Sequence, residues 1–286
     1  MAGLNSTPDI FRTGDLGLDR PGHPFYVLGA LQRIFLRRKL LYDLTLRSLR
    51  LQYTQTILGY FWVVLSPLAQ LLVLNFVFAG ILGRGGDSDQ YVLVLALGFF
   101  PWHLYAGAIS GGSESLVRAR GLIGSMSLPR DFLVIASVSA RILDFVVIVA
   151  LMIGLLVWTN HAPPASVVWV PLIFFFQLVF TVGLALPLAA LNVFYHDVRF
   201  LIALFLRVWF WMTPVFYTVD EVPEQYRFVY ELNPLAKFID AYRLTMLSGR
   251  TPAAADMAYI VFVPVLVLIL GYVVYSKLER TLVDRA

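Results

Sequence analysis

The sequence contains no cysteine, which excludes disulfide bonds, thiol nucleophiles and thiolate metal ligands. Histidine is also rare: His23, His103, His161 and His196 are scattered along the chain without the spacing of metal ligands. A zinc or haem site is therefore not expected, and no residue is assigned to a metal.

Charged residues are scarce as well. Only 14% of the 286 residues are charged, whereas 59% are apolar and the mean hydropathy is +0.76. A soluble protein is about 25% charged and about 45–50% apolar, so this chain has too little polar surface to cover a globule in water. The composition predicts an integral membrane protein. Its net charge of +4 is attributed to basic cytoplasmic loops, and no nucleic-acid partner is expected.

Long stretches of the chain have almost no Asp, Glu, Lys or Arg. A hydrocarbon core about 30 Å thick is crossed by about 20 helical residues, so each such stretch is a candidate span. The predicted spans are Leu58–Leu82, Gln90–Ser113, Phe132–Trp158, Val168–Phe194, Phe200–Val219 and Met257–Ser276. The predicted fold class is therefore an all-α integral membrane protein with six transmembrane helices.

The basic residues predict how these spans are oriented. An even number of spans places both termini on one side of the membrane. That side carries fifteen of the 22 Lys and Arg residues and the other side five, with Arg141 and Arg207 inside spans. The positive-inside rule therefore predicts that both termini are cytoplasmic. The first thirty residues lack a continuous apolar stretch, so a cleaved signal peptide is not expected.

The predicted organisation is a cytoplasmic N-terminal region, residues 1–56, followed by a six-span permease domain, residues 57–286. Residues 25–55 are helix-prone and basic, with leucines between the arginines. Two interpretations remain open: a basic flank of the first span, or an amphipathic helix lying in the membrane interface.

Reactive groups are few. The chain has no G-x-x-x-x-G-K-[ST] phosphate loop, so it is not expected to hydrolyse ATP by that route. Carboxylates inside or beside spans, which ion-coupled carriers use, are limited to Glu114 and Asp144. Arg141 precedes Asp144 by three residues, which favours a neutralising pair, with Arg207 as a further candidate partner, over a proton relay. Three outer-loop carboxylates are interpreted as a solvated face rather than a catalytic pair: Asp220, Glu221 and Glu224.

Six local motifs are more specific than hydropathy. They are Gly59-Tyr-Phe-Trp62-Val-Val-Leu-Ser-Pro67, Gly98-Phe-Phe-Pro101-Trp102, the loop from Glu114 to Arg130, Val193-Phe-Tyr195-His-Asp197-Val-Arg199, Trp209-Phe-Trp211-Met-Thr-Pro214-Val-Phe-Tyr217 and Leu232-Asn233-Pro234-Leu235. In order and spacing, over about residues 30–280, they resemble the membrane subunit of polysaccharide-export ABC transporters. That family includes O-antigen, capsule and teichoic-acid exporters, and the choice among these cargoes stays open.

The resemblance implies a homodimer in a bacterial inner membrane, joined by two copies of a separate ATP-binding cassette subunit. ATP and Mg would be bound by that partner, so this chain is expected to need no cofactor and to be no enzyme. The implied function is a channel-forming subunit that exports lipid-linked polysaccharide. The alternatives are a drug or small-lipid ABC exporter permease and, less favoured, a membrane glycosyltransferase or acyltransferase.

The resemblance also implies where the ATPase would dock. It places a coupling helix at about residues 114–127 and a second cytoplasmic contact at the Tyr195–Arg199 turn. A charged turn that merely obeys the positive-inside rule is the alternative. The residues expected to contact the ATPase are Glu114, Arg118, Arg120, Arg130, Tyr195, Asp197 and Arg199.

In the outer loop, the similarity implies an outer gate at about residues 220–247. Two short helices, Asp220–Phe228 and Leu235–Met246, would re-enter the outer leaflet on either side of a break. Pro234 forbids a continuous helix there, and Asn233 can cap the second piece. The expected gate residues are Pro214, Asn233, Pro234, Tyr242 and Arg243.

Aromatic residues make up 15% of the chain. Their rings can stack on the apolar faces of sugars, and Tyr and Trp add one polar tip, so they are candidates for a loose grip on a moving glycan. An interfacial aromatic belt is the alternative. The candidate channel-lining residues are Trp62, Phe100, Trp102, Tyr105, Trp211, Phe216 and Tyr217.

The lipid carrier of such a glycan would enter near the basic segment that precedes the first span. Arg37, Arg38 and Arg47 are the residues expected to attract its pyrophosphate.

Overall fold

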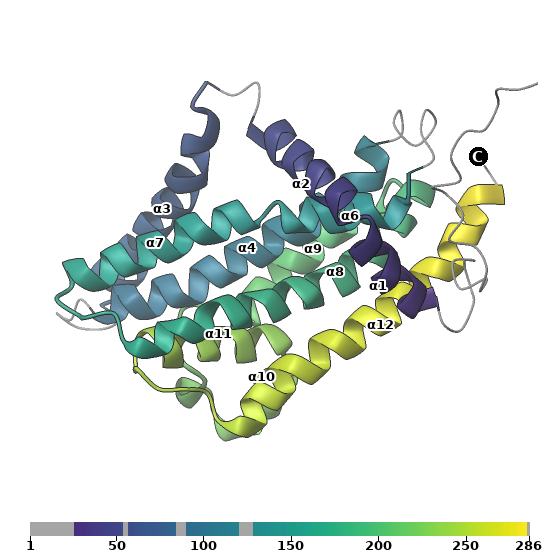
Figure 1. Cartoon of the computed structure of the whole chain (residues 1–286). Coiled ribbons are helices and arrows are strands. Elements are labelled where there is room, and N and C mark those ends of the chain that lie inside the picture. Colours follow the sequence, from purple (N-terminus) through teal and green to yellow (C-terminus); the bar gives the residue numbers. More distant parts are fainter. Residues whose placement is uncertain (1–25, 54–56, 84–89, 120–127, 285–286) are drawn as a thin grey trace, which may run out of the picture.

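The computed structural model describes residues 26–53, 57–83, 90–119 and 128–284, and over these residues the chain is helical without any strand. Figure 1 shows the arrangement of its helices. In chain order they are α1 (Tyr26–Leu36), α2 (Arg38–Tyr53), η1 (Gly59–Phe61), α3 (Trp62–Asn75), η2 (Phe76–Ile81), α4 (Gln90–Arg118), α6 (Arg130–Ser139), α7 (Ile142–Trp158), η3 (Ala165–Trp169), α8 (Val170–Phe194), α9 (Val198–Trp211), η4 (Val219–Glu221), α10 (Glu224–Glu231), α11 (Pro234–Met246) and α12 (Ala254–Asp284).

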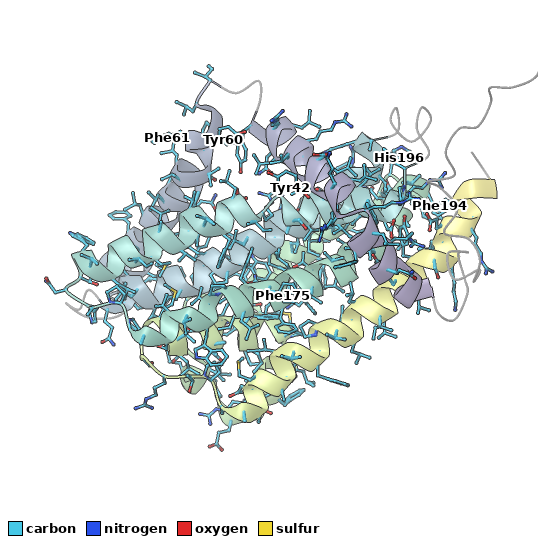
Figure 2. The ribbon with its side chains drawn as sticks, viewed as in Figure 1. Tyr42, Tyr60, Phe61, Phe175, Phe194 and His196 are labelled. Carbon is cyan, nitrogen blue, oxygen red and sulfur yellow. The ribbon has the colours of Figure 1, made fainter. Side chains whose placement is uncertain are left out.

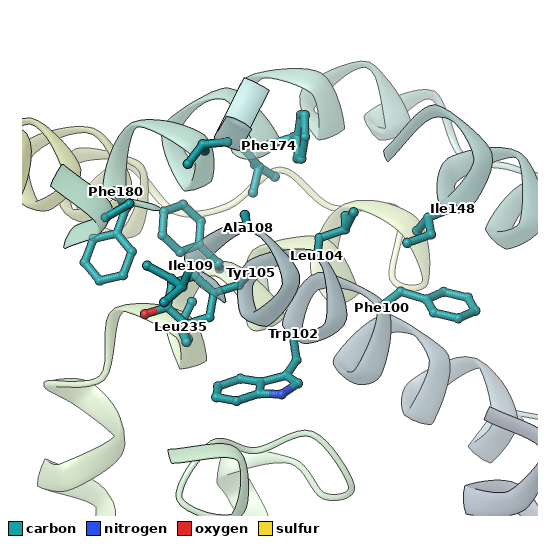
Figure 3. Packing of buried hydrophobic residues seen from close by; sticks show 14 of the residues in the cluster. Phe100, Trp102, Leu104, Tyr105, Ala108, Ile109, Ile148, Phe174, Phe180 and Leu235 are labelled. Carbon is teal, nitrogen blue, oxygen red and sulfur yellow. The ribbon is translucent and has the colours of Figure 1, made fainter. Parts of the chain in front are cut away.

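Helix α4 occupies the middle of the bundle. It packs against α8, α6, α11, α3, α7 and α9, and 72% of its most apolar part is buried. Figure 3 shows Trp102 and Tyr105 of α4 among the buried side chains around this helix. The Tyr105 ring lies 6.0 Å from the ring of Phe180 on α8 and 5.5 Å from the ring of Trp209 on α9. Aromatic packing therefore joins α8 and α9 to the two sides of α4.

Helices α8 and α12 approach each other at two glycines. A Cβ atom on Gly271 would stand 1.9 Å from the carbonyl oxygen of Gly183, and one on Gly183 would stand 2.7 Å from the backbone of Leu268. Neither position has room for a side chain. Small residues that let backbones pack closely are the usual contact between helices in lipid.

Five helical segments are long and apolar enough to cross a membrane. They are Gly59–Ile81, Gln90–Arg118, Arg130–Trp158, Ala165–Phe194 and Ala254–Thr281. They coincide with the first four predicted spans and the sixth. The prediction of an all-helical, multi-pass integral membrane protein is therefore confirmed.

The predicted fifth span, Phe200–Val219, is wrong at its end, because α9 stops at Trp211. Pro214 has no N–H to donate and disfavours helical backbone at Thr213, which favours the end of the helix before this proline. With 14 residues, α9 is about 21 Å long, which is shorter than a hydrocarbon core of about 30 Å.

The predicted coupling helix at residues 114–127 also differs from the structure. Glu114 to Arg118 form the last turn of α4, so the second span continues past Ser113 instead of giving way to a new helix. Residues 120–127, Arg120 among them, lie outside the described part of the chain.

The basic N-terminal segment forms two helices. Helix α1 packs against α12, and α2 packs against α6. The Arg33 guanidinium of α1 is 3.3 Å from the buried Asp131 carboxylate of α6. The helical part of the prediction for residues 25–55 is confirmed over the described residues. The proposed domain boundary at residue 56 falls in the undescribed residues 54–56.

Candidate functional site

Polar contacts between helices distinguish two ends of the bundle. We call the end formed by α1, α2, the C-terminal end of α4 and the turn between α8 and α9 the basal end. The end formed by α10, α11 and the N-terminal end of α4 is the apical end. Figure 1 shows them at opposite ends of the long axis that α4, α7 and α8 share.

At the apical end, Arg243 of α11 is buried and bonded to main-chain oxygens. Its guanidinium donates to the carbonyls of Val215 at 3.0 Å, Tyr217 at 3.0 Å and Val94 of α4 at 3.2 Å. Its guanidinium also lies 4.0 Å from the carboxylate of Asp240, three residues earlier on α11. One cation thus joins α11, α4 and the segment after α9.

The close fit at this point depends on Gly98 of α4. A Cβ atom there would stand 2.3 Å from the Val215 carbonyl oxygen and 2.7 Å from the Arg243 guanidinium. Arg243 can therefore reach the carbonyl of Val94 only because the neighbouring turn of α4 presents a glycine.

The Asn233 side chain connects α9 to α11. Its oxygen accepts from the indole N–H of Trp209 at 3.1 Å and from the main-chain N–H of Leu235 at 3.1 Å. Its amide nitrogen donates to the Thr213 hydroxyl at 3.0 Å. The predicted role of Asn233 as the N-cap of α11 is confirmed. The same amide also fixes the broken end of α9.

A third polar contact holds α11 against α4 and α8. The Tyr242 hydroxyl donates to Gln177 of α8 at 2.9 Å, and the Gln177 amide donates to the carbonyl of Pro101 at 2.8 Å. Tyr242 and Gln177 are both buried. The outer loop contains two short helices, as predicted. Helix α11 has nearly the predicted bounds, whereas α10 begins at Glu224 instead of Asp220 and ends at Glu231 instead of Phe228.

Nearer the basal end, Arg141 lies in the break between α6 and α7 and binds Asp144. Its guanidinium is 2.7 Å from the Asp144 carboxylate and donates to the Gly107 carbonyl of α4 at 3.0 Å. The predicted pairing of Arg141 with Asp144 is confirmed. Arg207 is exposed on α9, and the partners of Asp144 are Arg141 and Tyr53.

Tyr53, at the end of α2, was not expected in this cluster. Its hydroxyl donates to Asp144 at 2.7 Å, across 91 residues of sequence. Burial and the neighbouring Asp144 carboxylate raise the pKa of the Tyr53 phenol above its usual value, so the hydroxyl stays protonated and donates. The cluster therefore ties α2, α4 and α7 together.

The ends of α4 and α8, next to the two predicted coupling segments, meet at the basal end. The Asn192 amide near the end of α8 donates to the Ser113 carbonyl near the end of α4 at 3.0 Å, so the two helix ends lie side by side. Arg118 forms an ion pair with Glu114, and Arg130 is the first residue of α6. The exposed residues of the α8–α9 turn are Tyr195, His196, Asp197 and Arg199. Phe194 and His196 mark the position of this turn in Figure 2.

The candidate channel aromatics fall into two groups. Phe100, Trp102, Tyr105 and Phe216 are at most 6% exposed and pack inside the single chain. Trp62 and Trp211 are exposed and Tyr217 is half-buried. Figure 2 shows Tyr60 and Phe61 just before α3, on the same outward-facing segment as Trp62. A lining role remains a prediction for all seven, and exposure favours Trp62 and Trp211.

The three arginines predicted to attract the lipid carrier differ in their exposure. Arg38 and Arg47 are exposed on α2, whereas Arg37 lies half-buried between α1 and α2. Arg47, unlike the other two, lines a cavity between α2, α4 and α6. Over the described ranges, no group of three or more His, Cys, Asp or Glu side chains is arranged to hold a metal ion.

The helices and contacts define the class of the protein: a multi-pass membrane protein whose polar side chains join helices to one another. The chain belongs to the ABC-2 type transporter family, whose model matches residues 39–247.

Relatives extend this match along most of the chain. It is similar to the O-antigen export system permease protein RfbA of Klebsiella pneumoniae, with 27% identity over 241 residues that cover 84% of this chain and 92% of the relative. The protein of the same name from Myxococcus xanthus is 26% identical over 240 residues, covering 83% and 92%. The polysialic acid transport protein KpsM of Escherichia coli is 21% identical over 242 residues, covering 84% and 93%.

Proposed function

We propose that this chain is the membrane permease subunit of an ABC transporter that exports lipid-linked polysaccharide across a bacterial inner membrane. The observation that carries the proposal is its similarity, over more than four fifths of its length, to permeases named for O-antigen export and polysialic acid transport. The family assignment explains why a transport protein has no phosphate loop of its own. A separate ATP-binding cassette subunit would supply ATP hydrolysis.

In this proposal the chain crosses the membrane six times. Five crossings are the long helical segments, and the sixth is α9, completed on the outer side by α10 and α11. Irregular backbone at membrane depth is tolerated only where protein or a wet cavity surrounds it, and α11 packs against α4, α8 and α12. With six crossings and basic residues concentrated at the basal end, both termini are cytoplasmic.

The basal end is the proposed docking face for the ATPase. Glu114 and Arg118 lie there with the Tyr195–Arg199 turn, although 77 residues separate Arg118 from Tyr195 in the sequence. The Arg199 guanidinium lies 4.6 Å from the centre of the neighbouring Phe200 ring and is exposed. These side chains offer charged contacts on stiff helix ends, through which closure of a motor subunit can be transmitted.

The apical end is the proposed gate, and two copies of the chain form the channel. The segment formed by α3 and η2 and helix α9 expose large apolar side chains, including Phe76 of η2 at 65% and Trp211 of α9 at 63%, which a second copy or lipid would cover. Arg243, Asn233 and Tyr242 fix α11 to the rest of the chain, so we assign them the role of positioning the gate.

The test is reconstitution of the purified chain with its ATP-binding subunits in vesicles that contain lipid-linked polysaccharide. We expect ATP-dependent movement of the polysaccharide and a dimer of the permease with two ATPase chains. Arg199→Glu should weaken ATPase binding more than tenfold, whereas Arg227→Glu on α10 should leave it unchanged. Transport by the permease alone without nucleotide, or covalent transfer of sugar by the permease, would contradict the proposal.

A further inference from the structure

A cavity of about 630 Å³ lies at the basal end between α2, α4 and α6. Its α4 wall runs from Gly107 to Ala119, a length of about 18 Å at the helical rise of 1.5 Å per residue. The volume falls within the range of about 300–1,000 Å³ typical of ligand sites. The cavity thus leads from the end of the bundle inward along its central helix.

The charge of the lining is of one sign. Arg47 of α2, Arg118 of α4 and Arg141, which follows α6, contribute one guanidinium from each wall, and the lining contains no carboxylate. Four serines and Gln52 add neutral hydrogen-bonding groups.

The acidic partners of these arginines leave donors available. Arg118 pairs with Glu114, and Arg141 binds Asp144 through one terminal nitrogen and the Gly107 carbonyl through the other. Glu114 and Asp144 are not part of the lining. A guanidinium carries five N–H donors, so each of these contacts uses only part of the hydrogen-bonding capacity.

Glycines keep the α4 wall open. A Cβ atom on Gly107 would stand 3.1 Å from the Arg141 guanidinium carbon, and one on Gly111 would stand 3.4 Å from the Ser137 hydroxyl. Larger residues at these positions would crowd the arginine and fill the space between α4 and α6. The shape of the cavity therefore depends on two backbone positions of its central wall.

We propose that this cavity binds the diphosphate head group of a membrane lipid, at the reducing end of the exported glycan. Guanidinium groups bind phosphate oxygens in a planar, bidentate manner, and three of them from three walls match a group that carries two phosphates. Leu44, Leu51 and Leu133 give the same cavity an apolar side for the first part of the lipid chain. The inference rests on the proposed function. Of the three arginines predicted to attract the pyrophosphate it keeps Arg47, and it replaces Arg37 and Arg38 with Arg118 and Arg141, which line the cavity.

A second cavity provides a continuation. It has a volume of about 370 Å³, shares Gln52 and Arg141 with the first, and is lined further by Asp144, His103 and Ser66. It therefore extends the polar surface toward α3. Arg141 belongs to both cavities, whereas the Asp144 carboxylate lines only the second, so we expect the diphosphate to stay in the first.

The experiment uses the full chain in nanodiscs of phosphatidylcholine, with farnesyl diphosphate as the probe and calorimetry as the readout. Saturable binding is expected, with inorganic pyrophosphate as a competitor. Arg47→Gln and Arg118→Gln should each weaken binding about tenfold, since each removes a charge-assisted contact. Lys39→Gln, an equal loss of charge at an exposed position on α2 outside the cavity, should bind as wild type.

A steric variant separates the cavity from general electrostatics. Gly111→Val keeps every charge and fills the cavity, so binding should fall at least tenfold while the thermal unfolding transition confirms a folded chain. Unchanged binding in the Arg47→Gln/Arg118→Gln double variant would overturn the proposal. Equal affinity for phosphatidylglycerol vesicles would also overturn it, because the site would then be a general anionic-lipid surface.

Failure of this inference and failure of the proposed function give different results. If the chain with its ATPase exports polysaccharide and the cavity variants bind the probe normally, the head-group site is wrong and the transport function stands. If the variants lose binding but the wild-type complex moves no polysaccharide, the site stands and the transport function is wrong.

Discussion

Helix α4 and the segment Gly59–Ile81, which contains α3, are both long and apolar enough to span a membrane, yet they occupy opposite environments. In the most apolar part of α4, 72% of the residues are buried, against 17% in the segment that contains α3. At its contacts α4 carries small residues such as Gly98, Gly107 and Gly112, whereas α3 exposes Leu72 at 68%. Lipid is as apolar as leucine, so close packing and polar contacts, rather than hydropathy, select the central helix.

The largest expected effect is a change at the closest contact of α4. Gly98→Leu should lower the free energy of unfolding by about 3 kcal/mol, because the side chain would displace both the Val215 carbonyl and Arg243. Gly80→Leu, in the segment after α3, is the matched control, since a Cβ atom there meets only Phe76 at an ordinary 3.6 Å. Thermal unfolding in detergent measures both. Equal losses in the two variants would remove the distinction between the helices.

A somewhat smaller effect is expected where α7 and α2 join α4. Asp144→Ala should lower the free energy of unfolding by about 3 kcal/mol or slightly less, because the Arg141 charge is left uncompensated and Tyr53 loses its acceptor. In the double variant Arg141→Met/Asp144→Leu the loss should be smaller than in Asp144→Ala. A double-mutant cycle of Arg141→Met, Asp144→Leu and the double variant, monitored by unfolding, tests this, and strictly additive losses would show that the two side chains do not interact.

Loss of a single neutral hydrogen bond should lower the free energy of unfolding by a smaller amount. Tyr242→Phe leaves the Gln177 oxygen without its donor, which should lower the free energy of unfolding by about 1 kcal/mol. Tyr226→Phe on α10, where the ring is exposed, should have no effect on unfolding. If both variants unfold at the same temperature as wild type, the bond between α11 and α8 contributes nothing to stability.

The smallest effect on the single chain is expected on α3. Leu72→Ala should change the free energy of unfolding by about 0.5 kcal/mol or less, since the side chain contacts little of its own chain. Leu95→Ala, fully buried on α4, should lower the free energy of unfolding by about 2–3 kcal/mol. The unfolding midpoints of the two leucine variants, measured side by side, test the comparison directly; a large loss for Leu72→Ala would place α3 inside the bundle.

Hydropathy could predict five of the six expected spans because an apolar stretch of about 20 or more helical residues matches the thickness of the hydrocarbon core. It could not predict the end of α9, since Trp209–Tyr217 is as apolar as the helix before it and only Pro214 marks the break. The extension of α4 to Arg118 is hidden for the opposite reason, because a charged residue such as Glu114 predicts the end of a span although it lies within the helix.

The site was predictable only where its partners are close in sequence. Arg141 and Asp144 are three residues apart, and helical geometry is enough to pair them. Tyr53 is bonded to Asp144 across 91 residues of sequence, and Gln177 to Tyr242 across 65. No local sequence pattern predicts such pairs. Gln177 does leave one signal, as a neutral polar residue inside a long apolar run, because such a group needs a hydrogen-bonding partner in lipid.

The amide of Asn233 has a mechanical consequence. It receives an N–H from the last turn of α9, another from the first turn of α11, and donates to Thr213 in the connection between the helices. A rotation of α9 relative to α11 would break these three hydrogen bonds, each of which contributes about 1 kcal/mol to stability. We therefore expect the two helices to move together.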